Sequence, residues 1–367
     1  MNTVSLMPAT IAANWPGNFW WHLIILTVIL IGLIMTSVIM FIWLERRVIA
    51  RFQARLGPNR AGPFGLLQSF ADVIKILTKE DIIPTLADKV IFWMAPAIAF
   101  APVLMVMAVI PLSDGLQLAD INVGVIYISA VSAVTAVGIF MSGMASNNKY
   151  SLIGAMREIA QLISYEIPML LALAGIVMAS GSMSVSGVVA AQTIPFALTQ
   201  PLGFVVFIMA ILAEINRTPF DLVEADSELT AGFNTEYSGM KFAMLYLVEY
   251  SEAVVASVLI STFFLGGWRG PFLPGIIWLV IKMLASFFVI LWIRSTIPRF
   301  RIDQSMKLAW KTLLPLAMFN LFIMAIKTVY APGLTNWVEV PVYIVLTAVI
   351  IVLWARFMRP GRQTVGT

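Results

Sequence analysis

The chain contains no cysteine and only one histidine, His22. Without cysteine it has no disulfide, no thiolate-held iron–sulfur cluster and no catalytic thiol. A single histidine excludes an HExxH zinc site and bis-histidine haem ligation, so we expect no metal site on this chain. The sequence also lacks the glycine-rich motifs that bind a dinucleotide or a nucleoside triphosphate. Any electron carriers that work with this protein must therefore belong to other chains.

Charge is scarce as well. Charged residues make up 11% of the 367 residues and hydrophobic residues make up 60%, whereas about 25% of an ordinary soluble domain is charged. The mean hydropathy is +0.93. A water-soluble globule of this size cannot bury so much apolar surface in one core. The composition therefore excludes a soluble protein, a disordered chain and a nucleic-acid-binding module, and it indicates an integral membrane protein.

Long apolar stretches give the expected architecture, because about 20 apolar helical residues cross a bilayer core. The first stretch is followed by Glu45-Arg46-Arg47 rather than by a small-residue cleavage site, so it does not resemble a signal peptide. We expect an all-α polytopic membrane protein in which residues 1–367 form one integral membrane domain. Its nine predicted spans are 19–44, 90–112, 122–145, 157–181, 198–214, 241–265, 272–293, 308–327 and 337–357.

The basic residues predict the orientation of these spans. When the spans alternate across the membrane, twenty of the 23 Lys and Arg residues fall on one side. Arg269 and Lys327 fall on the other side, and Lys282 lies within a span. Since cytoplasmic loops are enriched in Lys and Arg, we expect a periplasmic amino terminus and a cytoplasmic carboxyl terminus. This is the topology of a multi-pass membrane protein.

The expected cytoplasmic loop 45–89 contains an amphipathic helix at 63–79. Gln68, Asp72, Lys75 and Lys79 follow one another at spacings of four, three and four residues, so they form one polar stripe. Apolar residues occupy most of the other positions. Such a helix can rest on lipid, or its stripe can line a protein cavity. Asp72 and Lys75 are one turn apart and can pair.

Ionisable residues inside the spans are the strongest functional signal. A charge at the bilayer centre costs about 2.5–3.5 kcal/mol, so such residues are rarely idle. Glu166 precedes Pro168 in the fourth span, and Glu158 lies two turns earlier on roughly the same face. These residues predict a proton relay, with static ion pairs between helices as the alternative. Its further members are Glu214, which closes the fifth span, Glu249 and Glu252 in the sixth, and Lys282 in the seventh.

A second cytoplasmic loop, 215–240, is rich in acidic residues. Thr218-Pro219-Phe220 and Gly232-Phe233 are not typical of a merely solvated loop. The acids continue the series found in spans four to six, which predicts a route for proton uptake from the cytoplasm. The loop carries Asp221, Glu224, Asp226, Glu228 and Glu236.

Four motifs in and around these loops resemble the NuoH family, the H-type membrane subunits of respiratory NADH:quinone oxidoreductase (complex I). They are Trp43-Leu44-Glu45-Arg46-Arg47, the stretch from Arg55-Leu56-Gly57-Pro58-Asn59 to Ala71-Asp72, the stretch from Asn216-Arg217-Thr218-Pro219-Phe220-Asp221-Leu222 to Tyr237-Ser238-Gly239-Met240, and Pro298-Arg299-Phe300-Arg301-Ile302-Asp303-Gln304. The resemblance covers roughly residues 40–355. Small departures occur: Ser69 replaces the usual proline, Asp226 the usual glutamate, and Asn234 a frequent histidine.

The resemblance implies a membrane-arm subunit that encloses a quinone chamber with neighbouring subunits and couples quinone reduction to proton translocation. Ubiquinone or menaquinone would be the substrate, and FMN, NAD and iron–sulfur clusters would sit only on partner subunits. Five acids would link the chamber to the proton path: Glu166, Glu214, Glu224, Glu228 and Glu249. The expected chamber residues are Arg46, Arg47, Gln53, Arg55, Asp72, Lys75, Phe220 and Asp221.

Three other functions fit parts of this pattern. The membrane subunit of an energy-converting nickel–iron hydrogenase shares the acid-rich loop, but the intact stretch from Gln53 to Asp72 favours the quinone enzyme. A stand-alone proton transporter would explain the intramembrane acids, yet the sequence shows no repeated halves. A passive anchor would keep the acids for structural reasons only.

Overall fold

The computed structural model describes residues 19–222, 230–330 and 340–357, and these ranges contain helices and loops without a strand. The order of elements confirms the all-α prediction. The helices are α2 (Phe19–Phe52), α3 (Leu67–Leu77), α4 (Lys89–Val109), α5 (Gly124–Ala145), α6 (Lys149–Ser180), α7 (Val185–Ala191), α8 (Phe196–Thr199), α9 (Pro201–Glu214), α11 (Gly239–Phe264), α12 (Gly275–Thr296), α13 (Ile302–Leu308), α14 (Leu314–Tyr330) and α15 (Val340–Phe357), with short 3-10 turns at Pro63–Gly65 and Gly232–Asn234.

Seven helical stretches of the described residues are long and apolar enough to cross a membrane: Thr27–Phe52, Lys89–Val109, Gly124–Ala145, Lys149–Ser180, Gly239–Phe264, Gly275–Thr296 and Ile302–Tyr330. The last stretch joins α13 to α14 through a π-helical turn at Ala309–Leu313. The expected fifth and ninth spans form shorter apolar helices, Pro201–Glu214 and Val340–Trp354. The chain is therefore a polytopic α-helical membrane protein.

The first helix continues beyond its predicted end. Residue 44 was expected to be the last of the span, but α2 runs on to Phe52 and includes Glu45, Arg46 and Arg47. Nothing in this stretch breaks a helix, because the first Gly-Pro pair comes only at Gly57-Pro58. Consequently these charged side chains project from a rigid helix rather than from a loop. In the stretch expected as the amphipathic helix 63–79, the structure has the 3-10 turn followed by α3.

Small residues let α4, α5 and α6 pack closely. An added Cβ at Gly138 of α5 would lie 2.5 Å from the Ala99 backbone nitrogen of α4, and one at Gly143 would lie 2.4 Å from Ala155 Cβ of α6. Close backbone approach at small residues is a common basis of helix association in membranes. These contacts hold α5 close to both α4 and α6.

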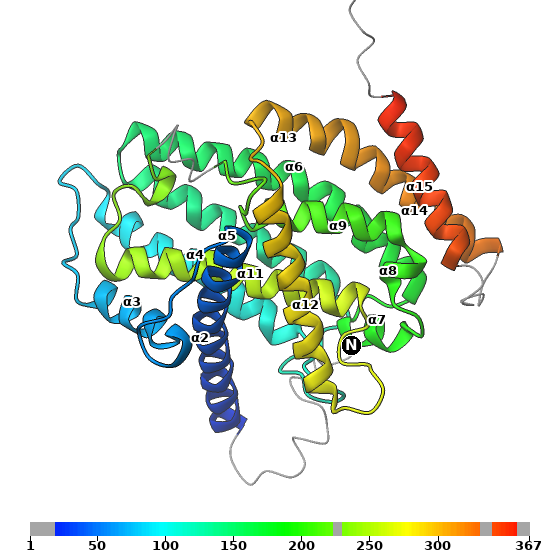
Figure 1. Ribbon diagram of the computed structural model, residues 1–367, viewed down its shortest axis with the longest axis horizontal. Coiled ribbons are helices and arrows are strands. Elements are labelled where there is room, and N and C mark those ends of the chain that lie inside the picture. The colour runs from blue at the N-terminus through cyan, green and yellow to red at the C-terminus, as the bar shows by residue number, and fades with distance from the viewer. Residues whose placement is uncertain (1–18, 223–229, 331–339, 358–367) are drawn as a thin grey trace, which may run out of the picture.

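Helix α11 runs through the middle of the bundle, while α2 and α12 cross it steeply in the view of Figure 1. Two-thirds of the α11 membrane window is buried, at 67%, compared with 22% for α2. Asn320 of α14 is buried, and its Oδ1 accepts a hydrogen bond from the Gly203 backbone of α9 at 3.2 Å. Helix α11, which carries Glu249 and Glu252, is therefore the most deeply buried of the seven candidate spans of the described residues.

Candidate functional site: a series of buried acids

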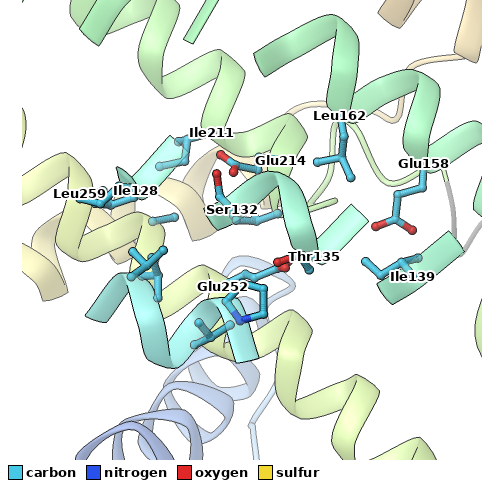
Figure 2. Close-up of a pocket in the computed structure, with 16 residues that line it drawn as sticks. Ile128, Ser132, Thr135, Ile139, Glu158, Leu162, Ile211, Glu214, Glu252 and Leu259 are labelled. Carbon is cyan, nitrogen blue, oxygen red and sulfur yellow. The ribbon is translucent and has the colours of Figure 1, made fainter. Parts of the chain in front are cut away.

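A central cavity of about 50 Å³ lies between α4, α5, α6, α9 and α11. Three carboxylates line it, Glu158 from α6, Glu214 from α9 and Glu252 from α11, together with the hydroxyls of Ser132 and Thr135. Figure 2 shows Glu214 beside Ser132, with Glu158 on the other side of the cavity. A water needs roughly 10–15 Å³ of such volume. The cavity thus has room for a few waters between three acids.

A smaller cavity of about 20 Å³ adjoins it, and we call it the inner cavity. It is also lined by Glu158 and Glu252, but its third acid is Glu249, and Asn216 completes the polar lining. The Asn216 amide donates to Glu158 Oε1 at 2.7 Å. Because Glu158 and Glu252 line both cavities, these two acids connect Glu249 to the central cavity.

On the opposite side, Glu214 also lines a pocket of about 230 Å³, the lateral pocket, which contains Glu166 and Tyr165 of α6. Glu158 and Glu166 were expected on roughly the same helix face. In the structure they line two different cavities, and Glu214 lines both of these. The carboxylates therefore follow the order Glu249, then Glu158 and Glu252, then Glu214, then Glu166.

A group of four alternating charges, two of them buried and two partly exposed, lies at the Glu249 end. We call it the charge quartet: Glu45, Arg217, Arg294 and Glu249. Arg217 Nη1 donates to Glu45 Oε1 at 3.0 Å, and Arg217 Nη2 lies 3.2 Å from Glu249 Oε1. Arg294 also donates to Glu45 Oε1. Glu45 and Arg217 are both almost completely buried. The quartet is electrically balanced, which is the usual condition for burying charge.

Arg217 stands in the turn after α9, and its guanidinium lies 4.4 Å from the centre of the Tyr250 ring. Burial by itself would lower its pKa, but the charges of Glu249 and Glu45 outweigh burial and raise the pKa above the ordinary value. Arg217 is thus a permanent cation between two carboxylates.

Gln161 of α6 holds the turn that carries Arg217. Its amide nitrogen donates to the Ala213 carbonyl at 2.8 Å, to Asn216 Oδ1 at 3.1 Å and to the Phe220 carbonyl at 3.0 Å. Gln161 is fully buried. A buried amide with three backbone or side-chain partners fixes the position of the turn, and therefore of Arg217, against α6.

On the loop side of the quartet lies an open pocket of about 530 Å³, the loop pocket, lined by Glu45, Arg46, Ile49, Arg55, Leu56, Gly57 and Pro58. Arg46 of α2 forms a salt bridge with Asp72 of α3. Gln68 also donates to Asp72 Oδ1 at 3.1 Å. Asp72 was expected to pair with Lys75 on its own helix, but it pairs with Arg46, and Lys75 is exposed. Glu45 thus joins the loop pocket to the charge quartet.

Arg47 and Gln53 were also expected in the chamber, and neither lines the loop pocket itself. Arg47 packs over the rings of Trp43 and Phe64, at 5.3 and 5.1 Å from their centres. Gln53 Oε1 accepts a hydrogen bond from Arg55 Nε at 2.7 Å on the exposed loop after α2. The two positions therefore differ, because Arg47 braces α2 against the turn that precedes α3, whereas Gln53 holds Arg55 at the pocket.

Phe220 and Asp221 of the acid-rich loop were expected in the chamber too, and both are more buried than the exposed Gln53. Phe220 is fully buried, with its ring centre 5.0 Å from that of Tyr165 and 5.5 Å from that of Phe300. Asp221 forms a salt bridge of 2.8 Å with Arg299. These contacts tie the start of the loop to the segment that precedes α13. Glu224 and Glu228 lie outside the described residues.

Lys282 does not join the acids. Its Nζ donates to the backbone carbonyls of Gly267 at 2.9 Å and Arg269 at 2.6 Å, beyond the carboxyl end of α11. The sequence placed Lys282 in the middle of its span, but a lysine chain is long enough to reach the end of the neighbouring helix. No group of three or more metal-ligating acids, histidines or cysteines occurs in the part of the chain that the structure describes.

Comparison with known proteins identifies the family. A family model described as NADH dehydrogenase matches residues 25–325. The H subunit of the NADH-quinone oxidoreductase of Dehalococcoides mccartyi (strain ATCC BAA-2266 / KCTC 15142 / 195) is 56% identical over 345 residues, which cover 94% of this chain and 98% of the relative. The chain belongs to the NuoH family.

More distant members agree. The corresponding H subunit of Brevibacillus brevis is 46% identical over 329 residues, covering 88% of this chain and 97% of the relative. That of Bacillus thuringiensis is 49% identical over 307 residues, covering 82% and 92%. The resemblance drawn from the four motifs is therefore confirmed across most of the chain.

Sequence reasoning did not single out Glu45 and Arg294 as site residues of this NuoH-family chain. The basic residues at the ends of the spans were attributed to membrane orientation, and this explanation concealed the ion pair of Arg294 with the buried Glu45. Glu45 did carry a signal, because it is a lone acid at the end of a span beside two arginines. A single acid in such a position needs a partner, and the partners come from distant parts of the chain.

Proposed function

We propose that this NuoH-family chain walls part of a quinone chamber at the loop pocket and passes protons along the buried acids when quinone is reduced. The observation that carries the proposal is a series of contacts that runs from Glu45 at the loop pocket through Arg217 to Glu249, and from there along the acids to Glu166 in the lateral pocket. Each step shares a cavity or an ion pair with the next. The chain is a subunit of the NADH-quinone oxidoreductase, and the redox cofactors of that enzyme reside on partner subunits.

The physical link is electrostatic. Reduction of a quinone creates negative charge, and in a low-dielectric chamber that charge acts much more strongly than it does in water. A new negative charge beside Arg46 and Arg55 weakens the hold of Glu45 on Arg217. The division of the Arg217 charge between Glu45 and Glu249 then changes, and the proton affinity of Glu249 changes with it. The acids beyond Glu249 respond through water in the inner and central cavities, whose volumes leave room for it.

The chamber is assigned to Arg46, Arg47, Gln53, Arg55, Asp72 and Lys75 around the loop pocket, with Phe220 and Asp221 supporting the loop that carries Arg217. An apolar isoprenoid tail fits the exposed apolar residues of α3, including Leu67, Phe70 and Ile74. Glu224 and Glu228 are assigned to proton uptake from the cytoplasm. The substrate class is ubiquinone or menaquinone.

The proposal includes the membrane arrangement. We place the amino terminus in the periplasm, the carboxyl terminus in the cytoplasm and the chain in the inner membrane, with α9 and α15 completing nine crossings. Helix α9 is 14 residues long, about 21 Å at 1.5 Å per residue, and so it crosses only together with the segment around α8. The peripheral-arm subunits that carry the terminal iron–sulfur cluster dock on the cytoplasmic loops.

Purification of the tagged chain in mild detergent tests the proposal. Bound flavin and iron–sulfur subunits with inhibitor-sensitive NADH:quinone activity are the expected result. Co-purified nickel with hydrogen evolution would assign the chain to the hydrogenase branch and remove the chamber residues from the account. Recovery of the chain alone, with proton transport in liposomes, would favour a stand-alone transporter.

A further inference from the structure

Three aromatic side chains stand one turn apart along α11. Phe242, Tyr246 and Tyr250 follow one another at spacings of four residues, so they share one face of the helix. The ring centres of Phe242 and Tyr246 are 6.0 Å apart, and those of Tyr246 and Tyr250 are 4.8 Å apart. Tyr250 is buried and Tyr246 is half-buried. We call Tyr246 and Tyr250 the phenol pair.

The two hydroxyls of the phenol pair are hydrogen-bonded to each other. The Tyr246 hydroxyl donates to the Tyr250 hydroxyl at 3.1 Å. A phenol has a single hydrogen to donate, and Tyr246 gives it to Tyr250. The oxygen of Tyr246 can therefore only accept from any further partner, which suits a cationic donor.

Arg46 of α2 is that donor. Its guanidinium interacts with the Tyr246 hydroxyl, in addition to its salt bridge with Asp72. The two partners come from different helices, because Asp72 belongs to α3 and Tyr246 to α11, and α11 packs against both α2 and α3. Asp72 carries a negative charge, whereas the phenol is neutral. Arg46 is thus held from two sides, and only one of its partners neutralises its charge.

The other member of the phenol pair reaches the charge quartet. The Arg217 guanidinium lies 4.4 Å from the centre of the Tyr250 ring. Contacts therefore run from Arg46 at the loop pocket through Tyr246 and Tyr250 to Arg217. They form a second connection between the pocket and the quartet, beside the direct one through Glu45.

Holding Arg46 matters because this arginine lines the loop pocket with its side chain 37% exposed. A long side chain so open to solvent has many rotamers, and a ligand that binds it must bear the cost of ordering it. Arginine has five N–H donors, and Asp72 is contacted through Nη1. Donors remain for an oxygen of a ligand, such as the carbonyl oxygen of a quinone head group.

We propose that Tyr246 is a positioning residue that holds Arg46 at the loop pocket, ready to bind the head group of the quinone. Tyr246 does not line the pocket itself, so it acts on the substrate only through Arg46. The inference rests on the proposed function, since it requires that quinone enter the loop pocket.

The test is the steady-state NADH:quinone kinetics of the whole complex, with short-chain ubiquinone and menaquinone analogues as substrates. Tyr246→Phe removes the hydroxyl and keeps the ring between its aromatic neighbours. The same substitution is made in an Arg46→Ala complex, which completes a double-mutant cycle. Tyr150→Phe, at an exposed tyrosine near the start of α6, is the matched control. Native gels establish that each complex is assembled.

The positioning role predicts that Tyr246→Phe raises the quinone KM about fivefold, as expected for the loss of one hydrogen bond, with kcat close to the wild-type value. Arg46→Ala should also raise KM, and adding Tyr246→Phe to it should change nothing more. Tyr150→Phe should match the wild type. A purely structural role for the hydroxyl would instead lower kcat or act equally in both backgrounds.

Three results would overturn the proposal. They are a wild-type KM in Tyr246→Phe, a fall in kcat without a rise in KM, and a rise in KM that persists in the Arg46→Ala background. Each of these leaves the quinone chamber standing, provided that Arg46→Ala itself raises KM. A wild-type KM in Arg46→Ala would contradict the chamber assignment, and the role of Tyr246 would fall with it.

Discussion

Arg217 donates a hydrogen bond of 3.0 Å to Glu45, although the two residues are 172 positions apart in the chain. The contact joins the helix that borders the loop pocket to the turn that carries the start of the acid-rich loop. Because Arg217 also faces Glu249, it stands between the pocket and the first acid of the series. In the proposed function, events at the pocket would reach the acids through this one guanidinium group.

We expect Glu45→Gln to destabilise the assembled complex strongly. The substitution leaves Arg217, which is buried, and Arg294, which is partly exposed, with Glu249 as the remaining carboxylate of the quartet. Removing one partner of the buried Arg217–Glu45 pair costs about 3–5 kcal/mol. Thermal melting of the complex and its yield on native gels measure the effect. The double variant Glu45→Gln with Arg294→Gln restores the charge balance and should recover part of the loss. Equal losses in the single and double variants would show that the quartet is not coupled.

Asp72→Asn should impair quinone reduction without a comparable loss of stability. The Arg46 and Asp72 side chains are 37% and 30% exposed, and pairs so accessible to solvent contribute about 1 kcal/mol or less. Loss of the carboxylate frees Arg46 at the loop pocket, which should raise the quinone KM or lower kcat. Steady-state kinetics with a short-chain quinone check this, and Glu80→Gln on the exposed segment after α3 serves as the control. Wild-type kinetics for Asp72→Asn would remove the pair from the chamber.

Filling the central cavity should slow proton transfer without removing an acid. Ala256 lines this cavity of about 50 Å³, so Ala256→Val places two methyl groups where water would bridge Glu252 and Glu214. We expect fewer protons pumped per NADH oxidised, measured with a dye in proteoliposomes. The exposed Ala101 of α4 provides a control, Ala101→Val. Full pumping by Ala256→Val in an intact complex would show that water in this cavity is not required.

Close packing of α4 and α5 should depend on Gly138. An added Cβ there would lie 2.5 Å from a backbone nitrogen, whereas one at Gly32 of α2 would meet nothing within 4 Å. Overpacking of this kind typically costs about 1–3 kcal/mol. Gly138→Ala should therefore lower the melting temperature of the complex, and Gly32→Ala should leave it unchanged. The same melting temperature in both variants would contradict the packing described for these helices.

Local patterns were sufficient to predict much of the architecture. Hydropathy alone located the long helices, and the intramembrane acids Glu166, Glu214, Glu249 and Glu252 were identified because a charge in a span is costly. The first span was expected to end at residue 44, where the apolar run ends, whereas the helix itself continues beyond that residue. The backbone has no breaker before Gly57-Pro58, so the helix continues to Phe52.

Long-range pairing was beyond what local patterns predict. Helical spacing suggested that Asp72 would pair with Lys75, yet the partner is Arg46 from another helix. Glu249 and Glu252 are one turn apart, but Glu249 faces Arg217 while Glu252 lines the central cavity as well as the inner one. Lys282 was grouped with the acids because it lies near the middle of its predicted span. Its long side chain instead reaches the carbonyls beyond α11. Each of these outcomes depends on which helices meet.

The most direct measurement of the central claim is the number of protons pumped per NADH oxidised by the Glu249→Gln complex in proteoliposomes, with Glu80→Gln as the control. Glu249 is the acid in contact with Arg217, so the account predicts that coupled pumping is largely lost. NADH oxidation with an artificial acceptor should stay at the wild-type rate, since that reaction involves only the partner subunits. An unchanged ratio of protons to NADH in Glu249→Gln would contradict the claim that the buried acids carry the protons.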